Sequence, residues 1–285
     1  MLLYGSVDNV LIRVEFKICG FSGAALNLAN YNWRLINMEG NLFSLTDHDR
    51  DRYTRQMMMS GLGSEGQLKL KNSTVFIAGA GGLGNPVATY LTVAGVGEIT
   101  ICDFDKIEVS NLNRHILYND RNIGDLKVIS AARTLRELNP FISISTSIDQ
   151  LNAKNIVNII GKPDVIVDCL DNFETRYLLN HYSVTQKIPV VYAAVRGMVG
   201  QVTFLAPPET PCLQCIFPEV PPKEITPILG ATPGVIGSIQ AMEVLKFLIG
   251  IGTLLKNRLL IFDGEEMAFN SITIQRKSSC PECGK

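Results

Sequence analysis

The sequence predicts an α/β fold in which helices cover both faces of a mostly parallel β-sheet. Short, continuous apolar runs alternate with helical segments from residue 73 onward, a pattern typical of parallel strands that are buried on both sides. A glycine-rich stretch at residues 79–84 follows the first of these runs and opens a helix. Only 19% of the 285 residues are charged, below the average of about 25% for globular domains, which argues against disorder.

The expected elements can be placed in order along the chain. Thr46 and Asp49 have capping-box spacing, which predicts a helix that begins here and carries residues 52–56. Apolar β-rich runs predict the strands of the sheet, at residues 74–78, 98–102, 142–146, 164–169, 189–195 and 199–205. Helices are expected between them at 86–94, 127–138 and 174–186. After a proline-rich stretch we expect a helix at 235–249 and closing antiparallel strands at 258–261 and 271–275.

Two parts of the chain differ in patterning. Residues 1–45 show short apolar runs broken by asparagines and carry no motif, so we interpret them as an N-terminal extension. Met38 is an alternative start for the native chain. Residues 46–285 are expected to form a single domain, because the motifs described below are spread along all of it.

Composition also excludes several classes of protein. A net charge of −1 gives little support for a nucleic-acid partner, which requires a basic footprint. No apolar run approaches the ~18 residues of a membrane span, and the N-terminus does not resemble an export signal. We therefore expect a cytoplasmic protein whose seven cysteines do not form a disulfide framework.

The glycine-rich turn predicts a Rossmann-like nucleotide site. In such a turn the first glycine, Gly79, permits the sharp bend, the second, Gly81, lets a phosphate approach the backbone, and the third, Gly84, lets helix and strand pack closely. The helix N-terminus favours an anion. Asp103, which is 24 residues after Gly79 at the end of the second strand, can accept hydrogen bonds from ribose hydroxyls. This motif alone does not separate NAD from ATP.

Charged residues beyond the turn favour ATP. A dehydrogenase has no need for several cations near the phosphates, but here Arg114 can bind a phosphate through two N–H groups and Lys127 adds a point charge. Residues 168–172, which include Asp168 and Asp171, end the fourth strand, where α/β sheets bind ligands, and a carboxylate there can hold Mg²⁺. Taken alone, each residue has the alternative explanation of a solvated charge or a helix cap, which we favour for Lys127 by itself. The other polar candidates of this set are Asp105, Ser110, Asn111, Asn113 and Asn172.

Four of the cysteines form two CxxC pairs, Cys212 with Cys215 and Cys280 with Cys283. One such pair places two thiolates on a metal, and two pairs complete a tetrahedral Cys₄ zinc site. The pairs are separated by 64 residues, so the fold must bring them together. A redox function for one pair remains an alternative.

In this order, the motifs resemble those of the HesA/MoeB/ThiF family, the prokaryotic relatives of ubiquitin-activating enzymes. The resemblance covers residues 47–284. The matching pieces are Arg52-Tyr53-x-Arg55-Gln56, the turn at 79–84, Asp103-x-Asp105, Ser110-Asn111-Leu112-x-Arg114, Lys127, Asp171-Asn172 and both CxxC pairs.

The resemblance implies ATP-dependent adenylation of a carboxylate, that of the C-terminal glycine in a ubiquitin-like sulfur carrier ending in Gly-Gly. The pathway would be molybdopterin, thiamine or tRNA thiolation. On this reading Gly82 and its turn contact the nucleotide, Asp103 binds the ribose, and Asp171 carries Mg²⁺, while the phosphates are bound by Asn111, Arg114 and Lys127. Arg55 would act in the active site of the neighbouring subunit, which requires a homodimer. The resemblance also favours zinc over redox chemistry at the four cysteines.

Alternatives remain within and outside the family. A relative could adenylate a tRNA-borne or peptide carboxylate, and the turn alone would also suit an NAD-dependent dehydrogenase or a non-catalytic binding module. Two departures from the family pattern stand out. The chain has no cysteine from residue 216 to 279, where the segment 225–229 reads ITPIL, and His115 replaces the usual glutamine.

Overall fold

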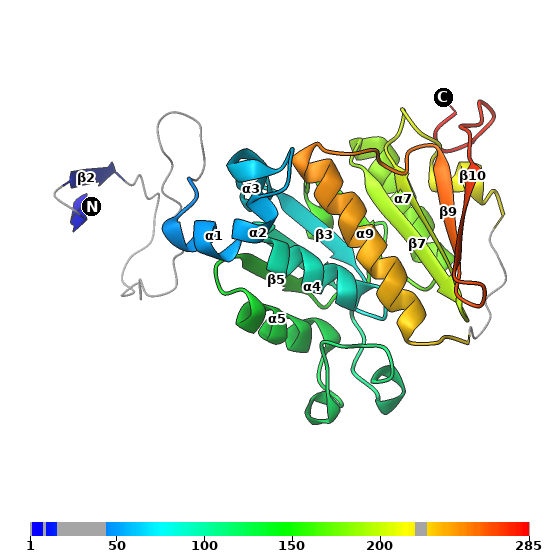
Figure 1. Cartoon of the computed structure of the whole chain (residues 1–285), viewed down its shortest axis with the longest axis horizontal. Helices are drawn as coiled ribbons and strands as arrows, with labels where there is room; N and C mark the ends of the chain where they lie inside the picture. Colours follow the sequence, from blue (N-terminus) through cyan, green and yellow to red (C-terminus); the bar gives the residue numbers. More distant parts are fainter. Residues whose placement is uncertain (1, 8–9, 16–43, 220–226, 285) are drawn as a thin grey trace. The chain divides into compact units, whose positions relative to one another are not determined.

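The computed structural model describes residues 2–7, 10–15, 44–219 and 227–284. The chain divides into two compact units, residues 1–40 and 41–285. The first unit contains an antiparallel hairpin of β1 (Leu2–Val7) and β2 (Val10–Glu15), which the sequence patterning did not predict. Everything described below belongs to the second unit (Figure 1).

The second unit is built on an eight-stranded sheet with the order β10-β9-β8-β7-β6-β3-β4-β5. Neighbouring strands pair in parallel from β7 to β5, and β8, β9 and β10 extend the sheet by antiparallel pairing. The predicted α/β class, including its antiparallel C-terminal strands, is therefore confirmed. The strands are β3 (Thr74–Ala78), β4 (Glu98–Cys102), β5 (Ser143–Ser147), β6 (Val165–Asp168), β7 (Val190–Arg196), β8 (Val199–Leu205), β9 (Arg258–Asp263) and β10 (Ala268–Thr273).

Helices cover both faces of this sheet, as the continuous apolar strands predict. One buried cluster joins the sheet to α3, α4, α5 and α9, and a second joins its other face to α6, α7 and α8; in Figure 1, α4, α5 and α9 lie in front and α7 behind. Among the described helices, none is long and apolar enough to cross a membrane. The helices are α1 (Asp47–Arg52), α2 (Thr54–Met57), α3 (Gly63–Lys71), α4 (Gly84–Ala94), α5 (Lys127–Leu138), α6 (Ile156–Ile160), α7 (Phe173–Gln186), α8 (Leu213–Ile216) and α9 (Ala231–Ile249), with short 3₁₀ turns η2 (Val109–Asn111) and η3 (Asp120–Asn122).

The helix expected to begin after Thr46 does so with the predicted capping box, but it does not continue to residue 56. It breaks at Tyr53, between α1 and α2. Tyr53 is buried, and its hydroxyl accepts a hydrogen bond from Asn139 Nδ2 at 2.8 Å. It packs over Gly95, where a Cβ would lie 2.5 Å from the tyrosine ring. This long-range anchor interrupts the helix, and local sequence cannot reveal it.

The ends of three parallel strands meet at one edge of the sheet. Ala78 at the end of β3 is in register with Cys102 of β4 and with Asp168 of β6. The segments that follow these strands therefore emerge side by side. They carry the glycine-rich turn, Asp103 and Asp171 respectively.

Candidate active site

The glycine-rich turn is seated tightly on the end of the sheet. The amide of Gly79 donates to the Cys102 carbonyl at 2.8 Å. Its φ of +100° is a conformation that side chains disfavour, and a Cβ there would lie 2.6 Å from the Cys169 carbonyl oxygen. A Cβ on Gly84 would lie 2.0 Å from the Gly79 carbonyl oxygen. Both positions therefore require glycine.

The middle of the turn is open to a ligand. Within the described part of the chain, the amide hydrogens of Gly81 and Gly82 have no acceptor. The helix that follows, α4, has no side-chain cap at its N-terminus. A Cβ on Gly82 would lie 3.2 Å from Pro233 and 3.5 Å from Cδ of Arg114. Free amides at a helix N-terminus beside an arginine form a site for an anion.

Side chains from other segments hold the turn in this conformation. Asn85 Nδ2 donates to the carbonyls of Ala80 and Gly81 at 2.8 and 3.0 Å, and Asn85 Oδ1 accepts from the Leu117 amide at 2.8 Å. The Tyr118 hydroxyl donates to the Ala80 carbonyl at 2.8 Å. Sequence reasoning missed Asn85 and Tyr118, because neither belongs to a motif and their contacts form only when the 115–118 loop packs on the turn.

Asp103 also braces the turn. Its carboxylate accepts from the amides of Ala80 and Asp105, each at 2.8 Å. Burial raises the pKa of Asp103, while the nearby Lys127 charge and these two amides oppose that rise. The nitrogen of Lys127 lies 2.7 Å from Asp105 Oδ2. The Lys127 side chain is only 9% exposed, while that of Asp105 is 51% exposed, so this pair opens to solvent on the carboxylate side.

Arg114 is held beside the turn by its own loop. Its Nη1 donates to the Ser110 carbonyl and to Asn113 Oδ1, both at 2.9 Å. Asn111 is buried, and its Oδ1 accepts from the Glu108 amide at 3.1 Å, which closes η2. The hydroxyl of Ser110 donates to Glu108 Oε2 at 3.2 Å. The loop thus orients the arginine, and the described part of the chain leaves the other guanidinium N–H groups without acceptors.

The two aspartates near the end of β6 have different environments. Asp168 is buried, and Arg176 Nε lies 3.5 Å from its Oδ2; burial raises the pKa of Asp168, and the arginine charge opposes this. Asp171 is exposed, with Asn172 Nδ2 at 3.5 Å from its Oδ1. Asn172 itself caps α7 by accepting from the Thr175 amide at 2.9 Å. Of this pair, Asp171 is the carboxylate that a ligand can reach.

Arg55 is placed differently from the other predicted nucleotide residues. It is exposed on α2. No hydrogen bond or ion pair of its side chain lies within the described residues. The structure therefore brings the other predicted nucleotide residues to the sheet edge and leaves this arginine pointing to solvent.

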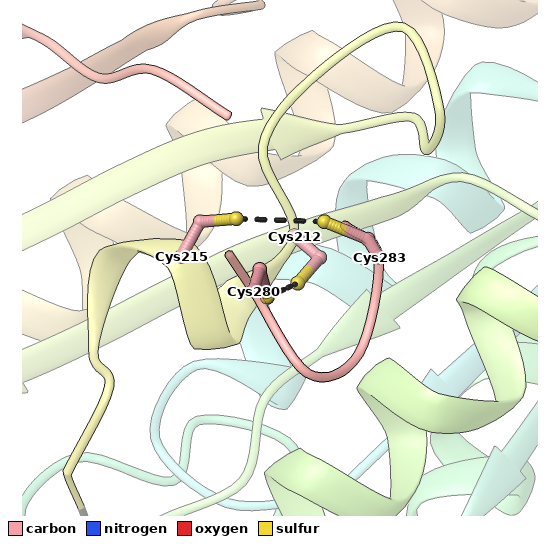
Figure 2. A group of neighbouring side chains, drawn as sticks. All are labelled: Cys212, Cys215, Cys280 and Cys283. Atoms are coloured by element: carbon pink, nitrogen blue, oxygen red, sulfur yellow. Dashed lines mark hydrogen bonds between the residues drawn. The ribbon is translucent and has the colours of Figure 1, made fainter. Parts of the chain in front are cut away.

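The two CxxC pairs come together as predicted from their spacing (Figure 2). All four sulfurs are buried and lie within 4.8 Å of one another. Cys212 and Cys280 have sulfurs 3.7 Å apart, and Cys215 and Cys283 have sulfurs 3.4 Å apart. A disulfide requires about 2.05 Å, whereas zinc–sulfur bonds of about 2.3 Å in a tetrahedron place sulfurs about 3.8 Å apart. The geometry fits a metal, and the described residues hold no second group of this kind.

Backbone amides contact sulfurs of this group, but burial still raises the pKa of the Cys212 and Cys215 thiols. The Lys277 amide donates to Cys215 Sγ at 3.4 Å. Burial raises the pKa of the Cys280 thiol, but the amides of Cys283 and Glu282 and the thiols of Cys215 and Cys212 oppose it, so that the pKa lies at about 7. Of the other cysteines, Cys102 and Cys169 are buried and Cys19 lies outside the described residues, as do residues 220–226 of the segment without cysteine.

The chain is similar to proteins of one family over most of its length. The model of the ThiF family matches residues 53–282. A sulfur carrier protein adenylyltransferase of Thermus thermophilus is 40% identical over 250 residues, covering 84% of this chain and 92% of that protein. The SAMP-activating enzyme E1 of Haloferax volcanii is 40% identical over 248 residues, covering 85% and 92%.

A longer relative and two solved structures are also similar to this chain. The adenylyltransferase and sulfurtransferase MOCS3 of Culex quinquefasciatus is 41% identical over 246 residues, which cover 84% of this chain and 56% of that protein. The chain thus spans little more than half of this relative. A crystal structure of E. coli MccB with MccA-N7isoASN has a TM-score of 0.76 at 25% identity, covering 83% of this chain and 75% of that one. MccB with ATP gives 0.73 at 26% identity, covering 85% and 76%. These relatives do not favour an NAD-dependent dehydrogenase.

Proposed function

The chain belongs to the ThiF family, and from this premise we propose that it adenylates the C-terminal glycine carboxylate of a ubiquitin-like sulfur carrier. The carrier carboxylate attacks the α-phosphorus of ATP, and pyrophosphate leaves with the electron pair of the broken P–O bond. The product is an acyl adenylate. The Thermus relative is named for adenylation of a sulfur carrier protein. The alignment with this chain covers 92% of that relative.

The observation that carries this proposal is the position of Arg114 against Gly82. A glycine turn with free amides would suit many nucleotides, but an arginine fixed beside it supplies charge where a triphosphate is cleaved. Lys127 adds a second cation nearby, because its nitrogen lies 2.7 Å from Asp105, whose amide donates to the Asp103 carboxylate. Two cations and two free amides suit a phosphate chain better than a nicotinamide ring.

Each predicted nucleotide residue has a role in this proposal. The amides of Gly81 and Gly82 bind phosphate oxygens, and Asp103 takes a ribose hydroxyl. Lys127 leaves Asp105 and turns to the phosphates, joined there by Arg114 and the Nδ2 group of Asn111. The residues that shape and close this edge of the site are Gly79, Gly84, Asp105, Ser110, Asn113 and Asn172.

Catalysis in this proposal consists of positioning and charge stabilisation. The carrier carboxylate is already a nucleophile, so the enzyme needs no nucleophile or general base of its own for this step. Negative charge moves onto the leaving pyrophosphate, and Arg114, which its own loop holds in place, stabilises that charge without reorganising. The mixed anhydride then leaves the acyl carbon ready for attack by a sulfur nucleophile.

Two metals fit the residues that are present. Asp171 is exposed and would hold Mg²⁺ together with phosphate oxygens, as magnesium sites with few protein ligands do; the ion would neutralise phosphate charge. The four cysteines would hold Zn²⁺, which would supply stability and no chemistry. Cys212 caps the N-terminus of α8 and Cys215 lies within it, and the Cys280–Cys283 pair lies in the tail after β10, so the metal would fasten the tail to α8.

The proposal also includes the location of the protein, its oligomeric state and the source of sulfur. We infer a cytoplasmic homodimer in which exposed Arg55 reaches the partner's active site. Since no cysteine lies between residues 216 and 279, the carrier would not be transferred to this segment, and another protein would deliver sulfur for molybdopterin, thiamine or tRNA thiolation.

The function is tested by pyrophosphate–ATP exchange with purified carrier proteins from the same organism. Exchange should require a carrier with a free C-terminal glycine carboxylate. A carrier truncated by its last two residues, at the same concentration, is the matched control. No exchange with any Gly-Gly-ended carrier would count decisively against the proposal.

A further inference from the structure

His115 is a buried imidazole at the glycine turn that the proposed mechanism does not use. It is 3% exposed. The edge of its ring faces Gly81, because a Cβ on that glycine would lie 3.7 Å from Nε2 and 3.9 Å from Cε1. The His115 amide donates to the Asn111 carbonyl at 3.0 Å, and its ring meets that of Tyr118 edge-on at 5.8 Å. The imidazole is thus fixed between η2 and the turn.

The two ring nitrogens of His115 have different surroundings. Nδ1 is buried and has no hydrogen-bond partner within the described residues. Nε2 also makes no hydrogen bond there, but it is not sealed from solvent, and it is the nitrogen that faces Gly81. Buried N–H groups without an acceptor are rarer in proteins than unfilled acceptors. The ring hydrogen is therefore better placed on Nε2, with the bare lone pair on Nδ1.

Burial and nearby charges keep the ring neutral. Burial, together with the cations Lys127 and Arg114, lowers the pKa of His115 to about 3, and Asp105 opposes this shift. A free imidazole titrates near 6.5. This ring therefore presents an uncharged N–H to the turn across the pH range in which most histidines change charge.

We propose that His115 is a nucleotide-binding residue whose neutral Nε2–H donates a hydrogen bond to a phosphate oxygen of ATP held at Gly81. This inference rests on the proposed function, because it needs ATP at the turn. The carrier carboxylate offers the same acceptor chemistry. The phosphate is the ligand we assign, because Nε2 faces the second glycine of the turn, where the backbone amides are free.

The first experiment compares binding of Mg-ATP and of adenosine, without carrier, to wild type, His115→Ala and His115→Gln by calorimetry. His115→Ala should weaken ATP binding on the order of tenfold or more, as expected for a hydrogen bond to a charged group, and leave adenosine binding unchanged. His115→Gln retains an N–H donor and should restore ATP binding. His48→Gln is the control, since His48 is exposed and stacks on Phe141.

The outcomes separate this inference from the function it rests on. Wild-type protein that binds no ATP would overturn both. If the wild type binds ATP and His115→Ala binds it equally well, or loses the same factor for adenosine, only the inference fails. A defect that appears solely in the KM for the carrier would identify the carboxylate as the ligand and also overturn it.

The second experiment reads the ring directly and does not depend on activity or on a stable alanine variant. The chain has three histidines, so ¹⁵N imidazole spectra of His48→Gln, His181→Gln and His115→Gln assign each ring. His115 should show a hydrogen on Nε2 and a bare Nδ1, unchanged from about pH 5 to 8, and its Nε2–H signal should move on addition of Mg-ATP. A hydrogen on Nδ1, or titration near the ordinary imidazole pKa, would overturn the proposal.

Discussion

The glycine turn and the four-cysteine group are two candidate binding sites in this domain, and they satisfy their polar atoms in opposite ways. The turn is braced from outside by Asn85, Tyr118 and Asp103, yet it leaves the amides of Gly81 and Gly82 without partners in the described chain. In the cysteine group, the four buried sulfurs face one another. Free donors beside a cation suit a ligand that binds and dissociates, whereas a closed group of buried sulfurs suits a permanently bound metal.

The largest effect should come from removing one ligand of the four-cysteine group. Cys280→Ser removes one of four metal ligands and leaves the remaining buried thiols incompletely satisfied. We expect loss of about one zinc per chain and a fall of several kcal/mol in the free energy of unfolding, since structural zinc sites contribute to folding outright. Elemental analysis and denaturant unfolding measure both quantities.

Cys102→Ser is the control for that experiment. Cys102 is as buried as the metal-site cysteines, and its thiol contacts the Asp149 carbonyl at 3.4 Å. It should keep the full metal content. Equal metal content and equal stability in Cys280→Ser would show that the cluster is not a metal site, and the contrast between the two sites would disappear.

The next largest effect should be a lower rate of pyrophosphate exchange when charged residues near the glycine turn are removed. Arg114→Ala and Asp171→Ala should each reduce pyrophosphate exchange by about 10²- to 10³-fold, the usual loss when one group that stabilises a transition-state charge is removed. Neither should lower the unfolding free energy much, because both side chains serve the ligand. Arg121→Ala, an exposed arginine of η3, is the matched control. Full exchange activity in either variant would remove that residue from the mechanism.

Pyrophosphate exchange also tests whether Arg55 acts in the active site of the partner subunit. If Arg55 acts in trans, mixing inactive Arg55→Ala and Arg114→Ala subunits creates dimers with one complete site. Random exchange of subunits should then restore about a quarter of wild-type activity. No recovery in a mixture proven to contain mixed dimers would place Arg55 in its own subunit's site.

The smallest effect should come from a single brace of the turn. Tyr118→Phe removes one buried hydrogen bond to the Ala80 carbonyl, which Asn85 still satisfies. We expect a loss of about 1 kcal/mol in stability and little change in ATP affinity, with Tyr90→Phe on the exposed surface of α4 as control. A large loss of affinity would mean that this hydroxyl alone fixes the turn.

Much of this architecture could be predicted from local patterns. Strand β3 is a five-residue β-rich run, apolar except for Thr74 and followed by glycine, and both its bounds match the expectation. Helix α3 was not predicted, because two glycines and the alternating Gln-Leu-Lys-Leu-Lys resemble a strand more than a helix. Its Gly66 packs so closely on α9 that a Cβ would lie 3.0 Å from Ile249, which is a tertiary reason for that glycine.

The candidate site also has residues that the sequence could predict and residues that it could not. Gly79, Asp103 and Asp171 could be grouped from sequence because each follows a strand of one sheet. The burial of His115 and the contact of Tyr118 with the turn could not be foreseen, because they depend on how a loop without regular structure folds back over the glycines. Spacing along the chain shows which segments share an edge of the sheet, but not which side chains lie against one another.

The four cysteines also have a topological consequence. With a metal bound, the 64 residues between Cys215 and Cys280, which include α9, β9 and β10, form a ring closed by metal–sulfur bonds. A protease or unfoldase that pulls on the C-terminal tail would reach that ring before it could peel β10 from the sheet edge. The lifetime of this protein in the cell would then depend on how quickly the metal is released, and cellular zinc supply would become a determinant of its turnover.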